Sequence, residues 1–256
     1  MFGICNLSVI PVRKESSDAS EMVTQLLFGE HFEILERKDP WRKIRIAHDG
    51  YEGWIDAKQM VGISDDEARV IQQAAAYVTL DLVQIVIYNQ TQMIPVVSGS
   101  TLPRYNNKKF KIGETEYSFD GTVRLSTTAD KKMIIENAYM YINSPYLWGG
   151  RSPFGIDCSG FTQVVFKLCG IRLKRDASQQ AEQGATINSL EDSMPGDLAF
   201  FDNGTGKITH LGILLPQHKI IHASGKVRVD KIDPQGIFNE EKNSYSYNLK
   251  LIKRIN

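Results

Sequence analysis

The chain has 256 residues, of which 42% are hydrophobic and 23% are charged, and its 30 basic residues balance 30 acidic ones. This composition is typical of a globular protein of two or three domains, and the mixed, neutral charge offers no extended basic surface for nucleic acid or anionic lipid. The three cysteines (Cys5, Cys158 and Cys169) are too few for a disulfide framework and lack the C-x-x-C spacing of a zinc site.

The N-terminal stretch MFGICNLSVIPVRK lacks the basic start and apolar core of a secretory signal. No apolar run in the chain approaches the roughly 18–20 residues of a membrane span. The sequence therefore predicts a cytoplasmic protein, or a periplasmic or secreted one if a native leader precedes Met1, and no membrane partner.

Residues 1–63 alternate short apolar runs with turn signals, a pattern typical of a small β-barrel. The Asp49–Gly50 pair predicts a hairpin, because glycine supplies the positive φ that a tight turn needs. Ser64, followed three residues later by Glu67, predicts a capping box that opens a short connecting helix.

Residues 64–126 continue after that helix with a second set of strands and turns, and predict a second small barrel. Residues 127–256 then combine helical and strand patterns. In the segment 158–169 the apolar residues recur at helical spacing, and Gly170 follows at the position that ends helices. Downstream, DLAFF, ITHLGILLP and KIIHASGKVRV predict consecutive strands, with a turn at PQHK. The fold class we expect is α+β, with a helix packed on an antiparallel sheet.

Cys158 stands in the first turn of the predicted helix, within FGIDCSGF. The positive end of the helix dipole and the free main-chain N–H groups favour thiolate over thiol and can hold an oxyanion. The alternative is a half-buried structural thiol, and Cys169 on the same helix keeps that interpretation.

A nucleophilic cysteine needs a base, and His210 and His222 lie on consecutive predicted strands. The two rings share a sheet face only if paired residue numbers add up to an even value, because a one-residue slip moves a side chain to the other face. In that register His210 is the candidate base, and His222 orients it as the third member of a triad.

The segments YLWGGRSPFGIDCSGFTQVVF, RDASQQ, MPGDLAFF, THLGILL and IIHASG, in this order, resemble the NlpC-type cell-wall cysteine peptidase family. The resemblance covers about half of the chain and implies a papain-like α+β domain without a cofactor or metal, in which Cys158, His210 and His222 form the triad. The first half, through DPWRKIRI and DGYEGWI, is similar to the bacterial SH3-like barrels that precede such domains.

The resemblance implies hydrolysis of the γ-D-glutamyl bond to an L-diamino acid in murein peptides, and paired SH3-like barrels imply short peptides with a free L-alanine amino terminus. The positions that match the family's substrate pocket are Tyr146, Trp148, Asp157, Ser159 and Asp176. Relatives often carry serine where this chain has Ala177, so one hydrogen bond to the substrate is missing or replaced. Lysine and diaminopimelate both remain open as the diamino acid.

The first barrel is expected to form one wall of the site. A buried substrate ammonium needs a carboxylate partner, and Asp176 is one candidate. The polar loops of the barrel offer Glu21 as a second, Glu15 as its alternative, and Tyr51 as a neighbour.

Three other interpretations remain open. Cys158, His210 and His222 suit a catalytic zinc site. The barrels suit a wall-binding module with a degenerate peptidase domain. An acyltransferase or amidase of the same superfamily would keep the thioester chemistry with another acceptor.

Overall fold

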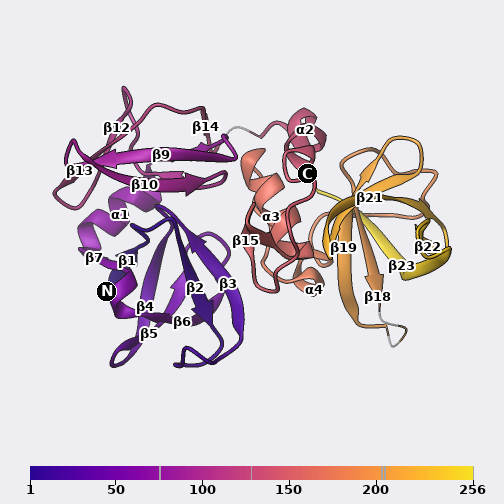
Figure 1. Ribbon diagram of the computed structural model, residues 1–256, viewed down its shortest axis with the longest axis horizontal. Coiled ribbons are helices and arrows are strands. Elements are labelled where there is room, and N and C mark those ends of the chain that lie inside the picture. The colour runs from indigo at the N-terminus through magenta and orange to yellow at the C-terminus, as the bar shows by residue number, and fades with distance from the viewer. Residues whose placement is uncertain (75, 128, 203, 205, 256) are drawn as a thin grey trace.

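The computed structural model describes residues 1–74, 76–127, 129–202, 204 and 206–255. The strands of the N-terminal half lie together on one side of the molecule, and the large sheet of the C-terminal half lies on the other (Figure 1). Helices α2 (Ile134–Tyr139), α3 (Cys158–Leu168) and α4 (Ala177–Gln180) lie between the two groups.

The first sheet has seven antiparallel strands in the order β3–β2–β6–β5–β4–β1–β7. Their bounds are β1 (Phe2–Ile4), β2 (Val9–Arg13), β3 (Met22–Leu27), β4 (His31–Lys38), β5 (Trp41–Ile46), β6 (Glu52–Asp56) and β7 (Val61–Ile63), with a short 3₁₀ helix, η1 (Ala57–Gln59), before β7. The predicted hairpin is confirmed, because β5 pairs with β6 across a turn in which Gly50 has a φ of 79°. Every second residue of β2 is buried, so one face of the sheet supplies its core.

Helix α1 (Asp65–Gln73) begins after Ser64, whose hydroxyl accepts a hydrogen bond from the Glu67 amide at 3.1 Å, as predicted. The other half of the expected capping box is absent. The Glu67 carboxylate instead accepts a hydrogen bond from the Gly113 amide at 2.7 Å, which ties α1 to the strands that follow.

Those strands, in the segment for which the sequence predicted a second barrel, form two sheets, β10–β9–β13–β12 and β11–β8–β14. Their bounds are β8 (Tyr77–Thr79), β9 (Val83–Tyr88), β10 (Gln92–Val97), β11 (Thr101–Leu102), β12 (Lys109–Ile112), β13 (Thr115–Phe119) and β14 (Val123–Leu125). Pro103 follows β11 directly and has no main-chain donor, so this strand ends after two residues.

The third part starts with a 3₁₀ turn, η2 (Lys131–Met133), before α2, and a hairpin of β15 (Arg151–Ser152) and β16 (Gly155–Ile156) precedes α3. The larger sheet consists of β17 (Ala185–Ile187), β18 (Leu198–Asp202), β19 (Ile208–Leu215), β20 (Lys219–Ser224), β21 (Lys226–Asp233), β22 (Gly236–Asn239) and β23 (Ser244–Arg254). Since β23 pairs with both β18 and β22, the strands from β18 to β23 close into a ring. The antiparallel pairing is as predicted, whereas the closure is not visible in the sequence.

The predicted strand KIIHASGKVRV is in fact two strands. Gly225 has a φ of 70° and turns the chain between β20 and β21, which pair antiparallel with Ser224 opposite Lys226. The hairpin brings residues from the start of β21 back beside His222.

The first sheet is joined to α3 and to the β15–β16 hairpin by a buried cluster of charges. Glu30 is only 4% exposed, and its carboxylate accepts hydrogen bonds from Arg151 at 2.8 and 2.9 Å and from Lys167 at 2.6 Å. Burial alone would raise the pKa of Glu30, but the two cations hold it far below its usual range.

Replacing Glu30 by glutamine is expected to lower the free energy of unfolding by about 3 kcal/mol or more, because two buried cations lose their counter-charge. The matched control is Glu33→Gln. The Glu33 side chain is 45% exposed in its pair with Arg45, so about 1 kcal/mol or less should be lost. Urea denaturation of both variants measures the difference, and equal small losses would contradict a structural role for the cluster.

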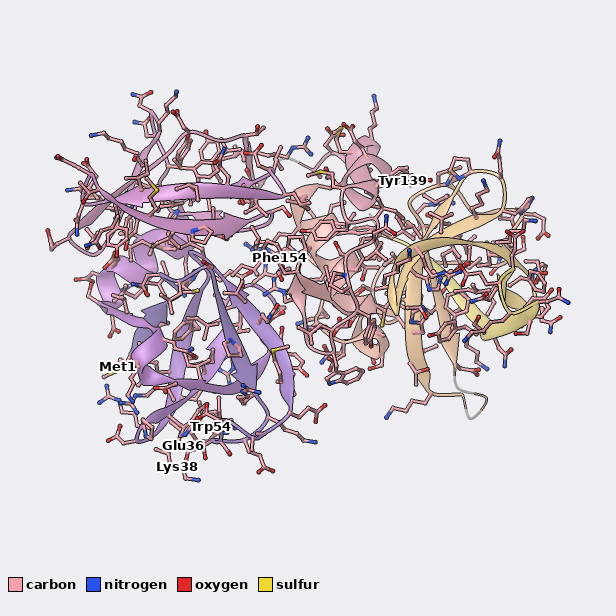
Figure 2. All side chains as sticks on the ribbon, viewed as in Figure 1. Met1, Glu36, Lys38, Trp54, Tyr139 and Phe154 are labelled. Carbon is pink, nitrogen blue, oxygen red and sulfur yellow. The ribbon has the colours of Figure 1, made fainter. Side chains whose placement is uncertain are left out.

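None of the helices in the described ranges combines the length and apolar character needed to cross a lipid bilayer. Phe154, on the loop between β15 and β16, lies near the junction of the first sheet and α3 in the view of Figure 2.

Candidate active site

Cys158 is the first residue of α3 and is 6% exposed. Asp157 caps the helix by accepting a hydrogen bond from the Gly160 amide at 2.6 Å. A Cβ atom at Gly160 would lie 2.3 Å from the Gly150 carbonyl oxygen, so only glycine lets the preceding loop approach this turn. The first turn of α3 is therefore tightly enclosed.

The Cys158 sulfur hydrogen-bonds with the main chain of Leu211 and Ser159, which places it beside β19. Burial, followed by the nearby charge of Asp157, raises the pKa of Cys158 to about 12. Burial therefore opposes the stabilisation of a thiolate that the main-chain groups at the start of the helix provide.

His210 and His222 lie on the same face of the sheet, as the even register requires. β19 pairs with β20 with Ile213 opposite Ile221, and His210 Nε2 lies 2.8 Å from His222 Nδ1. Burial, followed by the proximity of His222, lowers the pKa of His210 well below its usual value. His210 is thus a neutral base. It precedes Leu211, the residue of β19 whose main chain contacts the Cys158 sulfur.

The Tyr247 ring stacks on the His210 ring with a centroid distance of 4.0 Å and an interplanar angle of 14°. Tyr247 comes from β23, at the point where the ring of strands closes. This contact holds the imidazole plane in place and was not predicted.

Sequence reasoning also missed Asp230 on β21. Its Oδ2 lies 2.8 Å from His222 Nε2, and its Oδ1 accepts a hydrogen bond from Arg228 at 2.8 Å. Burial opposes ionisation, but the hydrogen bonds from His222 and Arg228 hold the pKa of Asp230 below its usual value. The available signal was the glycine between two strand-like runs, which predicts a hairpin that returns residues after Gly225 toward His222.

These contacts determine the histidine tautomers. Because the ionised Asp230 only accepts hydrogen bonds, His222 must carry its proton on Nε2 and accept at Nδ1. His210 then donates from Nε2 to His222, which leaves the lone pair on its own Nδ1. The nitrogen of His210 that is free to act as a base is therefore Nδ1.

Asp157 and Ser159, both expected to contact substrate, are buried and bound within the protein. Arg175 donates to Asp157 Oδ2 at 2.6 Å and to Ser159 Oγ at 2.8 Å, and Gly149 donates to Asp157 Oδ2 at 2.8 Å. These two side chains position the start of α3.

Tyr146 and Trp148 lie on the loop before β15. Burial, followed by the proximity of Cys158, raises the pKa of the Tyr146 hydroxyl, which places this ring next to the nucleophile. Trp148 is 59% exposed, and its indole N–H donates to Glu21, the residue before β3, at 2.7 Å. A Cβ at Gly149 would lie 2.4 Å from the Met22 carbonyl oxygen, so the loop rests directly on the start of β3.

Tyr51 and Asp176 form a second contact between the first sheet and the site. Their side chains share a hydrogen bond, and burial raises the pKa of both groups, that of Tyr51 to about 12. Asp176 also caps α4. Of the predicted barrel residues, Glu21 and Tyr51 thus reach side chains of the third part, whereas the Glu15 side chain is exposed.

The part of the chain that the structure describes contains no group of three or more His, Cys, Asp or Glu side chains arranged to hold a metal ion. In particular, His210 and His222 direct nitrogen atoms at each other.

A buried thiol at a helix start, beside a strand that carries a neutral histidine ordered by a second histidine and a carboxylate, is the arrangement of a cysteine hydrolase. Comparison with known proteins agrees. Residues 143–243 match the model of the NlpC/P60 family, and residues 12–60 match that of the bacterial dipeptidyl-peptidase Sh3 domain.

The gamma-D-glutamyl-L-lysine dipeptidyl-peptidase of Bacillus subtilis (strain 168) is 31% identical over 221 residues, which cover 78% of this chain and 71% of that protein. The protein of the same name from Bacillus cereus is 26% identical over 241 residues, 85% of this chain and 72% of its own. The chain belongs to the NlpC/P60 family of cysteine peptidases. A crystal structure of an NlpC/P60 family protein from Bacillus cereus has the same fold, with a TM-score of 0.82, 20% identity and 99% of each chain covered.

Proposed function

We propose that this protein is a cysteine endopeptidase that hydrolyses the γ-D-glutamyl to L-diamino acid bond of short murein peptides with a free amino-terminal L-alanine. The observation that carries the proposal is the placement of Cys158 beside the strand of the His210–His222 pair. We assign the reaction to a papain-like domain at 127–256 and SH3-like barrels to 1–63 and 64–126.

The reaction starts from a neutral thiol and a neutral imidazole. His210 Nδ1 takes the Cys158 proton as the sulfur attacks the γ-carbonyl carbon, and main-chain N–H groups at the start of α3 face the developing oxyanion. The protonated His210 then gives its proton to the leaving α-amine of the diamino acid. Water, deprotonated by the same nitrogen, hydrolyses the thioester and restores the thiol.

Mass spectrometry of products from L-Ala-γ-D-Glu-L-Lys tests the reaction. The curated relatives are named for L-lysine, so lysine is the first substrate and diaminopimelate the comparison. The expected products are L-Ala-D-Glu and the free diamino acid. Transfer of the acyl group to an added amine in preference to water would favour the acyltransferase alternative, and an intact peptide would favour a degenerate binding module.

The first sheet supports the requirement for a free amino terminus. Asp176 carries a carboxylate whose pKa is raised by burial, so a neighbouring ammonium would stabilise its ionised form. Glu21 and Tyr51 reach the same side of the third part through Trp148 and Asp176. We assign these groups, with Tyr146, to the binding of the L-alanine end of the substrate.

Acetylation of the substrate amino group is expected to reduce kcat/KM by at least about thirtyfold, because a partly buried carboxylate loses its charged partner. Asp176→Asn, which keeps the helix cap, should reduce this preference, and Glu21→Gln should do so to a smaller extent. Glu15→Gln is the matched control and should leave the preference unchanged. Equal rates for free and acetylated peptides, or efficient digestion of intact sacculi, would contradict the proposed closed site.

Asp230→Asn is expected to lower kcat about 10²-fold with little change in KM, because an amide no longer enforces the His222 tautomer that accepts from His210. The acidic limb of the pH–rate profile should move to lower pH, since the loss of a nearby negative charge makes His210 less basic. Asp233→Asn on the same strand serves as the control, because Asp233 interacts with Tyr245 and lies outside the histidine pair. An unshifted limb in Asp230→Asn would mean that Asp230 is only structural.

A further inference from the structure

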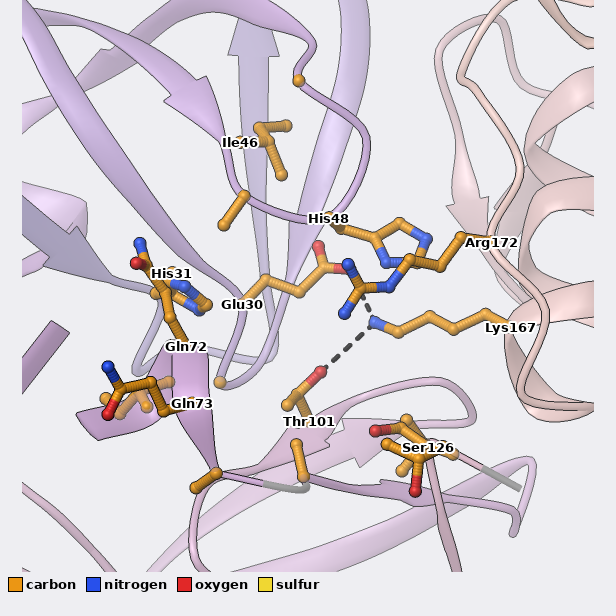
Figure 3. Close-up of a pocket in the computed structure, with 18 of the residues that line it drawn as sticks. Glu30, His31, Ile46, His48, Gln72, Gln73, Thr101, Ser126, Lys167 and Arg172 are labelled. Carbon is orange, nitrogen blue, oxygen red and sulfur yellow. Dashed lines mark hydrogen bonds and ion pairs between the residues drawn. The ribbon is translucent and has the colours of Figure 1, made fainter. Parts of the chain in front are cut away.

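A cavity of about 620 Å³ lies where the first sheet, α1 and the end of α3 meet (Figure 3). Its lining includes none of the residues assigned to the active site, and its volume is that of a typical small-molecule site. It is walled by segments far apart in the sequence, so a ligand there would contact all three parts of the chain.

The side chains of His31 and His48 belong to the lining of this cavity. Nε2 of each ring is shielded from solvent, and so also from the cavity, and has no hydrogen-bond partner among the described residues.

Positively charged side chains outnumber negatively charged ones around these rings. Lys167 and Arg151 share the single carboxylate of Glu30, while no ion pair of Arg172 occurs among the described residues. Figure 3 shows the Arg172 side chain extending from the third part of the chain toward His48 and Lys167. Arg45, at the rim, is balanced by its own carboxylate partners.

The same excess acts on the histidines. Burial, followed by the charge of Lys167, holds the pKa of His48 well below its usual value, although Glu30 opposes this effect. Burial also lowers the pKa of His31, where Arg172 and Lys167 act against Glu30. Both rings are therefore neutral, and the positive charge beside them comes from Lys167 and Arg172.

The lining also contains hydrophobic side chains, from Phe2, Ile46, Ile71, Val78 and Ile171. Its uncharged polar groups are carboxamides and hydroxyls, from Gln72, Gln73, Thr101 and Ser126. An occupant that suits this lining carries both a negative charge and a hydrocarbon part.

We propose that this cavity binds a small organic anion, with its carboxylate or phosphate at Arg172, beside the rings of His31 and His48, and its apolar part on the hydrophobic side chains of the lining. The site is distinct from the peptidase centre and does not depend on the proposed peptidase activity.

Isothermal titration of the full-length protein with hexanoate and hexyl phosphate tests the proposal and distinguishes the two anionic groups. At least one of them should bind with a dissociation constant below about 10 mM, and uncharged hexanamide should bind at least about tenfold more weakly. Inorganic phosphate should also bind more weakly than hexyl phosphate, because it lacks the apolar part. NMR signals of the His31 and His48 rings should shift with the bound anion.

Arg172→Gln should weaken binding of the better anion at least about tenfold. Arg172 is exposed, so the variant is expected to fold, and an unchanged melting temperature without ligand verifies this. Arg69→Gln on the exposed side of α1 is the matched control and should bind like the unmodified protein. The proposal is wrong if neither anion binds below about 10 mM, if hexanamide or inorganic phosphate binds equally well, or if Arg172→Gln has no effect.

Discussion

Cys158→Ala is expected to reduce kcat/KM on L-Ala-γ-D-Glu-L-Lys by at least about 10⁴-fold, because no other group can form the thioester. The Cys158 sulfur contacts the main chain of Leu211 on β19, the residue that follows the proposed base His210. Substrate binding should persist, since alanine keeps the helix start and removes only the sulfur. The residual rate is measured from the product formed by the purified variant at fixed times. Titration of the variant with substrate measures the retained affinity.

Cys169→Ala is the matched control on the same helix. Cys169 is fully buried in the core, accepts a hydrogen bond from the Asn137 amide at 3.2 Å, and has a pKa raised by burial to about 11. Its loss should lower stability by about 1 kcal/mol and leave kcat/KM unchanged. An irreversible thiol reagent offers a separate test: activity that survives complete labelling of Cys158 would contradict its role as nucleophile.

Local signals in the sequence were sufficient for the elements that carry the proposed chemistry. The apolar stripe and Gly170 predicted a helix over 158–169, and α3 runs from Cys158 to Leu168 with Gly170 at a φ of 75°. The alternation rule for strands stated which register would put His210 and His222 on one face; the structure has that register, and the two rings are in contact. Both features are local: the helix depends on residues close together in the sequence, and the histidine pair depends on a single hairpin.

Contacts between distant segments could not be predicted in this way. Glu30, Arg151 and Lys167 look like ordinary surface charges in the sequence, and only the packing of the first sheet on α3 buries them together. Closure of the ring by β23, which brings Tyr247 onto His210, likewise depends on a pairing of strands far apart in the chain. The raised pKa of Cys158 is a further case, because burial is a property of the whole site and helix position is a local one.

His210→Gln is expected to lower kcat by about 10²–10⁴-fold with a small change in KM, because the thiol then has no base to take its proton. Glutamine retains a donor toward His222 Nδ1, so the hydrogen bond that orders β20 can persist. His218→Asn is the matched control: His218 lies in the exposed turn between β19 and β20 with a φ of 52°, a conformation that asparagine tolerates. It should retain full activity.

The pH profile separates a base from a structural histidine. His210 acts only when neutral, and its pKa is lowered by burial and by His222, so kcat/KM should decline on the acidic side only well below pH 6.5, the unperturbed value. On the alkaline side, the raised pKa of the Cys158 thiol, about 12, means that little thiolate forms as the pH rises toward that value. We therefore expect no increase of kcat/KM from thiolate formation below that pH. Because the two groups are coupled, the profile reports the pair. The residual activity of His210→Gln should lose the acidic limb, and a limb that persists unchanged in this variant would assign the titration, and with it the role of base, to another group.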